Sequence, residues 1–149
     1  IKVLLAFGSK TSLRHQRTGD SALHIACRFG EPSTVSAVLG SLRGKDDKLN
    51  PIKDKNGARQ RLVCSRNRKH ETSLHIACKR GRFDIVEALL ANSSSATANK
   101  ALAAEDYHGH TPLLSAIVAG DKDIVMHLLT WRGNHRGNVP FARDCPLVL

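Results

Sequence analysis

Histidine and cysteine are the residues of this 149-residue chain with the clearest capacity for chemistry, because they can bind metal ions or attack a substrate. Two of the eight histidines, His108 and His110, flank a single glycine. A zinc site needs three or four ligands, and no third ligand lies near this pair in the sequence. The cysteines form no Cys-x-x-Cys pair, and they are Cys27, Cys64, Cys78 and Cys145. We therefore expect neither a metal site nor a cofactor.

Cysteine-based catalysis is the other chemistry that these residues could support. A nucleophilic cysteine needs a base beside it, and His24 and His75 lie three residues before Cys27 and Cys78. The same His-Ile-Ala-Cys sequence stands at both places, which indicates a structural role within a repeated pattern. The chain also has no phosphate-binding glycine loop, no paired-carboxylate motif and no Ser-His-Asp signature. It is therefore predicted not to be an enzyme and to have no small-molecule substrate.

Composition limits the class of protein. Hydrophobic residues make up 41% and charged residues 24%, which is typical of a globular chain. Aromatic residues are only 4%, so the core has to consist of Leu, Ile, Val and Ala, which suits small regular helices. No apolar run approaches the roughly 18 residues of a membrane span, and without a secretory signal the cysteines are expected to be free thiols. These features predict an intracellular protein, in the cytoplasm or the nucleus, and the start at Ile1 suggests an excised fragment.

The elements that position these residues follow from an internal repeat. Three segments align with one another, at 21–30, 72–81 and 111–120, and a trace of a fourth occurs at 145–147. Each opens on a hydroxyl residue suited to cap a helix, continues with Leu and Ala three positions apart, and closes on glycine. The capping residues are Ser21, Thr72 and Thr111, and the closing glycines, expected in the left-handed conformation, are Gly30, Gly81 and Gly120.

A second helix is expected after each glycine. Residues 84–90 and 123–129 match position for position and carry Ile, Val, Leu and Leu on one face, whereas 33–39 is a weaker version led by Pro32. Helices this short are not stable alone in water. They have to bury their apolar faces against each other and against neighbouring pairs, which predicts an all-α solenoid of stacked helix-turn-helix units.

This pattern resembles the ankyrin repeat, and the third copy, 106–113, keeps the complete Asp-x-x-Gly-x-Thr-Pro-Leu start of that family. The resemblance implies an ankyrin-repeat α-solenoid whose helix pairs are joined by hairpin loops. It also implies that His24 and His75 bridge backbone groups of adjacent repeats. In the second copy Asn67 and His70 replace the Asp and the Gly, so the left-handed glycine conformation is not assured in that hairpin.

The chain is expected to be one ankyrin-repeat domain of three repeats between two partial ones. Two insertions lengthen the connections that follow second helices, and the serine run in the second insertion favours a flexible linker. The expected order is the tail of a preceding repeat at 1–15, a repeat at 16–43, a basic insertion at 44–66, a repeat at 67–91, a short insertion at 92–105, a repeat at 106–139 and the start of a further repeat at 140–149.

Protein binding is the function that the resemblance implies. Partners of this family contact the hairpin tips and the first helices, at positions that packing leaves free to vary. The matching positions are Arg17, Thr18, Asp20, Arg28 and Phe29 in the first repeat, Arg68, Lys69, Glu71, Lys79 and Arg80 in the second, and Tyr107, His108, His110, Val118 and Ala119 in the third. The middle of this surface is cationic and its third repeat is aromatic and apolar, with Phe29 and Tyr107 as the expected anchors. The expected partner is another protein with an acidic and partly hydrophobic segment.

A basic stretch supports a different class of partner. Residues 43–69 contain ten basic and three acidic residues, in a chain whose formal net charge is +10. This stretch could contact nucleic acid, an anionic membrane or a nuclear import receptor, or it could be a surface loop. It has no interleaved aromatic residues for base stacking, so nucleic-acid binding there would be nonspecific. Two further alternatives are that the chain is the regulatory segment of an enzyme or ion channel, and that the assigned surface contacts nothing.

Overall fold

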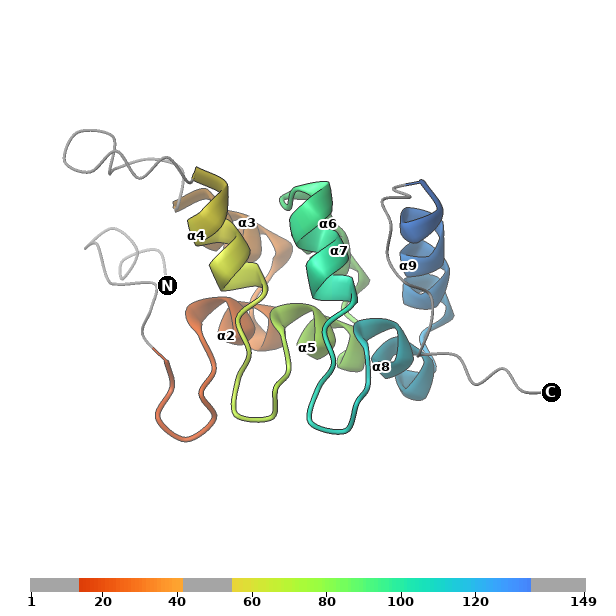
Figure 1. Ribbon diagram of the computed structural model, residues 1–149, viewed down its shortest axis with the longest axis horizontal. Helices are drawn as coiled ribbons and strands as arrows, with labels where there is room; N and C mark the ends of the chain where they lie inside the picture. Colours follow the sequence, from red (N-terminus) through yellow and green to blue (C-terminus); the bar gives the residue numbers. More distant parts are fainter. Residues whose placement is uncertain (1–13, 42–54, 135–149) are drawn as a thin grey trace.

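The chain folds into a row of stacked helix pairs, seen in the computed structural model, which describes residues 14–41 and 55–134 (Figure 1). Within those residues the regular elements are helices, with one isolated β-bridge between Arg14 and Ser21. The helices are α2 (Ala22–Phe29), α3 (Pro32–Ser41), α4 (Lys55–Val63), α5 (Ser73–Lys79), α6 (Phe83–Ala91), α7 (Ser95–Leu102), α8 (Pro112–Ala119) and α9 (Lys122–Asn134). The predicted all-α repeat solenoid is confirmed.

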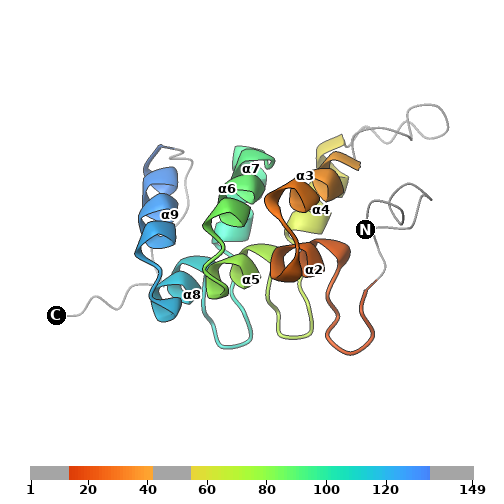
Figure 2. The ribbon, with the colours of Figure 1, turned by 180° about the vertical axis from the view of Figure 1, so that it is seen from behind.

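Two rows of helices carry the stack. The first helices of the repeats, α2, α5 and α8, lie side by side, and the second helices, α3, α6 and α9, form a row along them (Figures 1 and 2). Aliphatic side chains fill the space between the rows, and Leu23, Leu74, Ile85, Leu89 and Leu128 are each at most 2% exposed. Burying one such side chain contributes about 1.5–3 kcal/mol. Stacking therefore supplies the stability that single helices of this length lack.

The helix ends follow the sequence in most places. Thr72 and Thr111 cap α5 and α8, because their hydroxyls accept hydrogen bonds from backbone N–H groups of the first turn. Gly81 and Gly120 have φ of 63° and 77°, which is the predicted left-handed conformation. The prediction was wrong for Gly30, which is extended, with φ −85° and ψ −175°. Glycine is needed there for space, because a Cβ would lie 2.5 Å from the carbonyl oxygen of Ala26, one turn earlier in α2.

The two insertions contain helices, so the expectation of a loop and a flexible linker was wrong. The helix α4 lies within the basic insertion and α7 within the serine-containing one. The side chain of Ser94 caps α7 by accepting a hydrogen bond from the N–H of Thr97 at 3.3 Å. On the inner face of α7, Ala98, Ala101 and Leu102 are at most 2% exposed. α4 contacts α7, so the inserted helices form a further row beside α3 and α6 (Figures 1 and 2).

Three hairpin loops project from one side of the stack, each leading into a first helix (Figure 1). Their turns contain Gly19, His70 and Gly109, with φ of 70°, 59° and 74°. The second hairpin thus has the same left-handed turn as the others, although a histidine replaces glycine there. Such a conformation costs a residue with a Cβ roughly 1–2 kcal/mol.

Some expectations lie outside the described residues. These are the further repeat at 140–149, the segment 1–13 of the preceding repeat's tail, the ends of two repeats at 42–43 and 135–139, and the part of the basic insertion before residue 55. The proposed repeat boundaries stay predictions. Among the described helices, none combines the length and the apolar character that crossing a membrane requires.

Candidate binding surface

The repeated histidines are structural, as the resemblance implied. Nδ1 of His24 accepts a hydrogen bond from the N–H of Ser21 at 3.2 Å, so the proton lies on Nε2, which donates to the carbonyl oxygen of Glu71 at 2.9 Å. His75 repeats this arrangement and donates to the carbonyl oxygen of His110 at 2.8 Å. Burial lowers the pKa of both imidazoles. They are thus held neutral, with Nδ1 engaged by the capping residue of the same repeat and Nε2 joining that repeat to the next.

The repeated cysteines are packing residues. Cys27 and Cys78 are fully buried, and burial raises the pKa of each thiol to about 12. A thiol of this kind does not form the thiolate that nucleophilic attack or metal binding requires. The part of the chain that the structure describes also has no group of three or more His, Cys, Asp or Glu side chains that could hold a metal ion.

Hydrogen bonds between hairpins hold the hairpin tips in register. The N–H of Arg68 donates to the carbonyl oxygen of Thr18 at 3.0 Å. The N–H of Tyr107 donates to the carbonyl oxygen of Lys69, also at 3.0 Å. Each hairpin is therefore tied to the next through its tip and not only through its helices. Side chains at neighbouring tips stand at fixed positions relative to one another.

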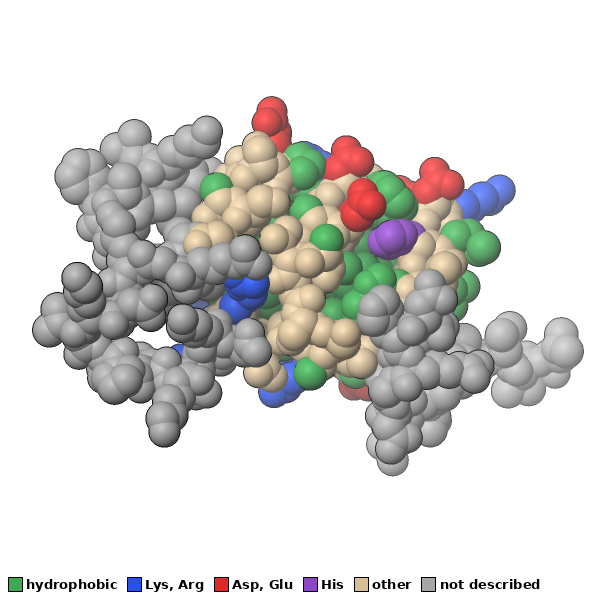
Figure 3. Space-filling view, turned by 90° about the horizontal axis from the view of Figure 1, so that it is seen from above, with side chains coloured by type: hydrophobic (Ala, Val, Ile, Leu, Met, Phe, Trp, Pro, Cys, Tyr) green, Lys and Arg blue, Asp and Glu red, His purple; other side chains and the backbone are tan. Residues whose placement is uncertain are grey.

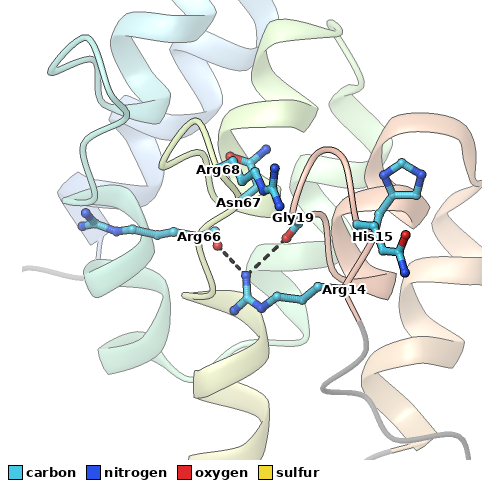
Figure 4. Close-up of a pocket in the computed structure, with 7 residues that line it drawn as sticks. Arg14, His15, Gly19, Arg66, Asn67 and Arg68 are labelled. Carbon is cyan, nitrogen blue, oxygen red and sulfur yellow. Dashed lines mark hydrogen bonds between the residues drawn. The ribbon is translucent and has the colours of Figure 1, made fainter.

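A second connection joins the base of the first hairpin to the segment that precedes the second hairpin. The two hairpins enclose a shallow pocket of roughly 310 Å³ (Figure 4). Within it, the guanidinium of Arg14 donates to the carbonyl oxygens of Gly19, at 3.3 Å, and of Arg66 (Figure 4). The side chain of Arg66 points away from that of Arg14, so their charges do not converge on one site (Figure 4).

The positions assigned to partner binding differ in exposure. The large apolar side chains among them are strongly exposed, Phe29 at 73%, Tyr107 at 75% and Val118 at 71%. The other exposed ones are Arg17, Arg68, Lys69, Lys79, Arg80, His108 and Ala119. Thr18, Arg28 and His110 are half-buried.

Asp20 and Glu71 were expected to be exposed, and this expectation was wrong. They are only 3% and 7% exposed. Each lies directly before a helix-capping residue and turns inward to meet a cation of its own first helix. Asp20 pairs with Arg28 at 3.2 Å, and Glu71 pairs with Lys79 at 2.7 Å. Burial favours such pairing, because a carboxylate removed from water needs a donor nearby.

These pairs join into a chain of polar side chains that we call the carboxylate network. The amide of Asn67 donates to both Asp20, at 2.9 Å, and Glu71, at 3.1 Å. The ammonium of Lys79 also contacts Asp106 of the third hairpin, at 3.0 Å. The network runs through all three repeats, and its members are Asp20, Arg28, Asn67, Glu71, Lys79 and Asp106. Sequence reasoning missed the roles of Asn67 and Asp106, which it treated only as turn residues.

The network sets the ionisation of its members. Burial alone would raise the pKa of Asp106, but hydrogen bonds from the N–H groups of His110 and His108 and from Lys79 lower it to about 2. Burial opposes ionisation of Glu71 too, and Lys79 and Asn67 outweigh it, so the pKa of this carboxyl is lowered. The pKa of Lys79 is raised by the two carboxylates despite partial burial. All three groups are therefore charged at neutral pH.

The cationic centre expected on the first helices is consequently weaker than the sequence indicated. Arg28 and Lys79 are neutralised by their carboxylate partners. In the described ranges, Arg17, Arg68, Lys69 and Arg80 form no ion pair, and three of these four lie at hairpin tips. The positive charge that is open to a partner therefore lies mainly at the tips.

The structure also changes the interpretation of the basic insertion. Arg59 belongs to the basic stretch that was considered for contact with a polyanion. Its side chain points into the fold and donates to the carbonyl oxygens of Leu39 and Asn92, both at 3.2 Å. These carbonyls lie at the C-terminal ends of α3 and α6, where a cation is favourable. Arg61 and Arg66 are exposed. Arg59, which is half-buried, thus holds the inserted helix on the repeats.

Acidic side chains gather on another part of the molecule. Viewed from above, Asp and Glu lie along the edge formed by the second helices (Figure 3). Exposed members include Asp84 and Glu87 on α6 and Asp123 on α9. The hairpin tips are thus basic, whereas acidic side chains gather on the second helices.

An aromatic cluster occupies the tips of the second and third hairpins. The Tyr107 ring lies edge-on to His70, at 5.9 Å between ring centroids, and edge-on to His108, at 6.3 Å. His108 in turn lies 5.8 Å from His110. His70 was missed as a surface residue because it stands where the family has glycine. Its place at the turn could have indicated an exposed side chain.

The comparisons with known proteins agree with this architecture. The family model described as "Ankyrin repeats (3 copies)" matches residues 52–138. The NF-kappa-B inhibitor alpha proteins of Rattus norvegicus and Mus musculus are each 30% identical to this chain, over 75% of its length. The chain spans only 42% of the length of these relatives. With three stacked helix pairs, left-handed hairpin turns and histidines that bridge neighbouring repeats, the chain belongs to the ankyrin-repeat family.

Proposed function

We propose that this chain is a protein-binding module that acts by holding a partner and not by catalysis. The observation that carries this proposal is the exposure of Phe29, Tyr107 and Val118 on hairpins and first helices. Aromatic side chains such as those of Phe29 and Tyr107 are enriched in protein interfaces and among their binding hot spots. Arg80, directly after the first helix of the second repeat, adds a cation without an ion partner in the described residues, and Arg is enriched in binding hot spots.

The partner that best suits this surface has both acidic and hydrophobic side chains. Unpaired cations at the tips favour acidic groups, and the exposed rings of Phe29 and Tyr107 favour apolar ones. The relatives are named as inhibitors of NF-kappa-B, which supports a regulatory role in which binding holds a partner back. We propose such a regulatory role for this chain, as a scaffold or as the recognition part of a larger protein. The intracellular location stays a prediction.

Affinity capture followed by mass spectrometry tests the proposal. The chain is compared with a triple variant, Phe29→Ala/Val118→Ala/Tyr107→Ala, which truncates the three exposed side chains. The matched control is Met126→Ala/Leu129→Ala, since these side chains are 62% and 46% exposed but lie on the second helix α9. We expect a partner that is captured by the wild type and the control and lost with the triple variant. Equal capture by all three proteins, or capture of no partner, would overturn the proposal.

A further inference from the structure

We infer that the hairpin tips form one preorganised strip that binds an extended acidic protein segment, with an apolar side chain of that segment lying over the third hairpin. This inference rests on the proposed function and names the chemistry and direction of the partner. The strip consists of Arg17, Arg68, Lys69, His70, Tyr107 and His108. It differs from the surface expected from the sequence, because it places the charge recognition at the tips and leaves the neutralised first-helix cations out.

The strip is rigid before any partner arrives. The hydrogen bonds from Arg68 to Thr18 and from Tyr107 to Lys69, both 3.0 Å, connect the three hairpins in series. Within the second hairpin, Oδ1 of Asn67 accepts hydrogen bonds from the N–H groups of Lys69 and Glu71, at 2.9 and 3.0 Å. A rigid surface loses little conformational entropy on binding. The tips can therefore hold a partner that is itself flexible.

The third hairpin is fixed in the same way. Oδ1 of Asp106 accepts hydrogen bonds from the N–H groups of His108 and His110, at 2.9 and 3.0 Å. The other oxygen of Asp106 is engaged by Lys79. The turn that presents Tyr107 is therefore held at both ends.

Charge determines which partner the strip fits. Arg17, Arg68 and Lys69 are exposed and have no ion pair in the described residues. Three acidic side chains of the hairpins, Asp20, Glu71 and Asp106, point inward and are satisfied within the carboxylate network, and the exposed Glu105 stands before the third hairpin, away from the first two tips. Exposed acids gather on the second helices instead (Figure 3). Only an anionic partner would provide counter-charges for these tips.

The charge changes along the strip, which gives the partner a direction. Cations occupy the first and second tips, whereas Tyr107 dominates the third and is 75% exposed. Its ring has edge-on contacts with His70 and His108, which limit its movement. A fixed aromatic ring of this kind is a good anchor for an apolar side chain. The acidic part of the partner therefore lies over the first two hairpins and the apolar part over the third.

The strip matches a peptide better than a nucleic acid. Neighbouring helices pack about 10 Å apart, so three tips span about 20 Å, which about six extended residues cover. Single-stranded nucleic acids are held by successive aromatic platforms, one for each base. The strip has a single aromatic cluster, around Tyr107, at one end. Nucleic-acid binding is therefore an outcome that the experiment has to distinguish.

Fluorescence anisotropy with two defined probes tests the inference. Both are fluorescein-labelled peptides of about twelve residues built from Glu, Asp, Gly and Ser, and one has Phe where the other has Ala. We expect both to bind, the Phe peptide more tightly. Arg68→Glu/Lys69→Glu should weaken both by about tenfold or more. The matched control, Arg61→Glu/Lys100→Glu, makes the same change of charge on exposed residues of α4 and α7, and should weaken them less than about threefold. Tyr107→Ala should abolish the advantage of the Phe peptide.

Three results of the anisotropy measurements would overturn the inference. They are no binding of either peptide, equal losses in the tip variant and its control, or an RNA oligonucleotide that competes as well as the peptides with no effect of Tyr107→Ala. Circular dichroism of each variant at 25 °C confirms that it is folded. A partner captured from cells that is lost with Phe29→Ala/Val118→Ala but kept by Arg68→Glu/Lys69→Glu would leave the protein-binding function standing and refute the strip.

Discussion

Replacement of Lys79 by methionine should destabilise the fold by about 2 kcal/mol. The ammonium of Lys79 lies 2.7 Å from Glu71 and 3.0 Å from Asp106, whose side chains are only 9% and 1% exposed. Methionine keeps most of the length of the side chain but leaves both carboxylates without their cation. Breaking a fully buried ion pair costs about 3–5 kcal/mol, and an exposed pair contributes about 0.2–1 kcal/mol. The Lys79 side chain is 36% exposed, so solvent screening places the expected loss between these limits.

Urea denaturation followed by circular dichroism at pH 7 measures this loss. Arg80→Met is the matched control, because Arg80 is the next residue, is exposed and has no ion pair in the described residues. It should change the free energy of unfolding by less than about 0.5 kcal/mol. Equal effects of the two substitutions would refute the view that the carboxylate network stabilises the repeats.

The pH dependence gives a second test of the same reasoning. The pKa of Asp106 is about 2 in the folded chain and 3.8 ordinarily, so its ionised form contributes stability above about pH 4 that is lost as the pH falls toward 2. A difference of nearly two pKa units corresponds to about 2 kcal/mol. Removing Lys79 should raise the pKa of Asp106. The variant then takes up protons earlier as the pH falls, and its deficit relative to the wild type should shrink. A deficit that stays constant down to the lowest pH at which the chain is folded would contradict this account.

Three further predictions concern the core, the bridging histidines and the hairpins. In urea denaturation, Leu89→Ala should lower the free energy of unfolding by about 2–5 kcal/mol, and Leu129→Ala by less than about 1 kcal/mol. The reason is that Leu89 is 2% exposed and Leu129 is 46% exposed. Equal losses of stability would contradict the stacking. The folded-state pKa of His24 and His75 lies below the ordinary 6.5, because burial disfavours the charged imidazole. Their contribution to the free energy of unfolding should therefore be fully present above pH 6.5 and be lost as the pH falls below it. A thermal midpoint that does not change between pH 7 and pH 5 would refute this. Gly19→Ala should lower the free energy of unfolding by roughly 1–2 kcal/mol and weaken binding at the tips. The φ of Gly19 is +70°, and a Cβ there would lie 3.0 Å from a side-chain carbon of the next hairpin. An unchanged midpoint of urea denaturation would argue against tightly packed tips.

The helix pairs could be predicted because their signals are local. Thr72 and Thr111 cap helices through hydroxyls that reach backbone groups three residues on, at 3.5 and 3.3 Å. The spacing of leucine and alanine defines one apolar face whatever surrounds the helix. Three copies of the same pattern then required a partner for each face. This reasoning gave the solenoid without knowledge of any long-range contact.

The inserted helix α7 was missed although its signal is also local. Ser94 is a capping residue, and Ala98, Ala101 and Leu102 follow at helical spacing. The serine run was interpreted by composition, which favoured a linker. A count of periodic positions would have found the helix. The inward position of Arg59 had no such signal, because the carbonyl groups it binds lie 20 and 33 residues away in the chain.

The sequence by itself determined the repeat, its helices and its left-handed turns at Gly81 and Gly120, and the family resemblance implied the bridging histidines. Only the tertiary structure decided which charges are available to a partner. Asp20 and Asn67 are 47 residues apart and are brought together by stacking of the first two hairpins. A carboxylate is a surface group or a buried one according to the side chains within about 4 Å of it, because desolvation and ion pairing act over that distance. The sequence lists the charges, and stacking pairs those on the first helices while leaving those at the hairpin tips free.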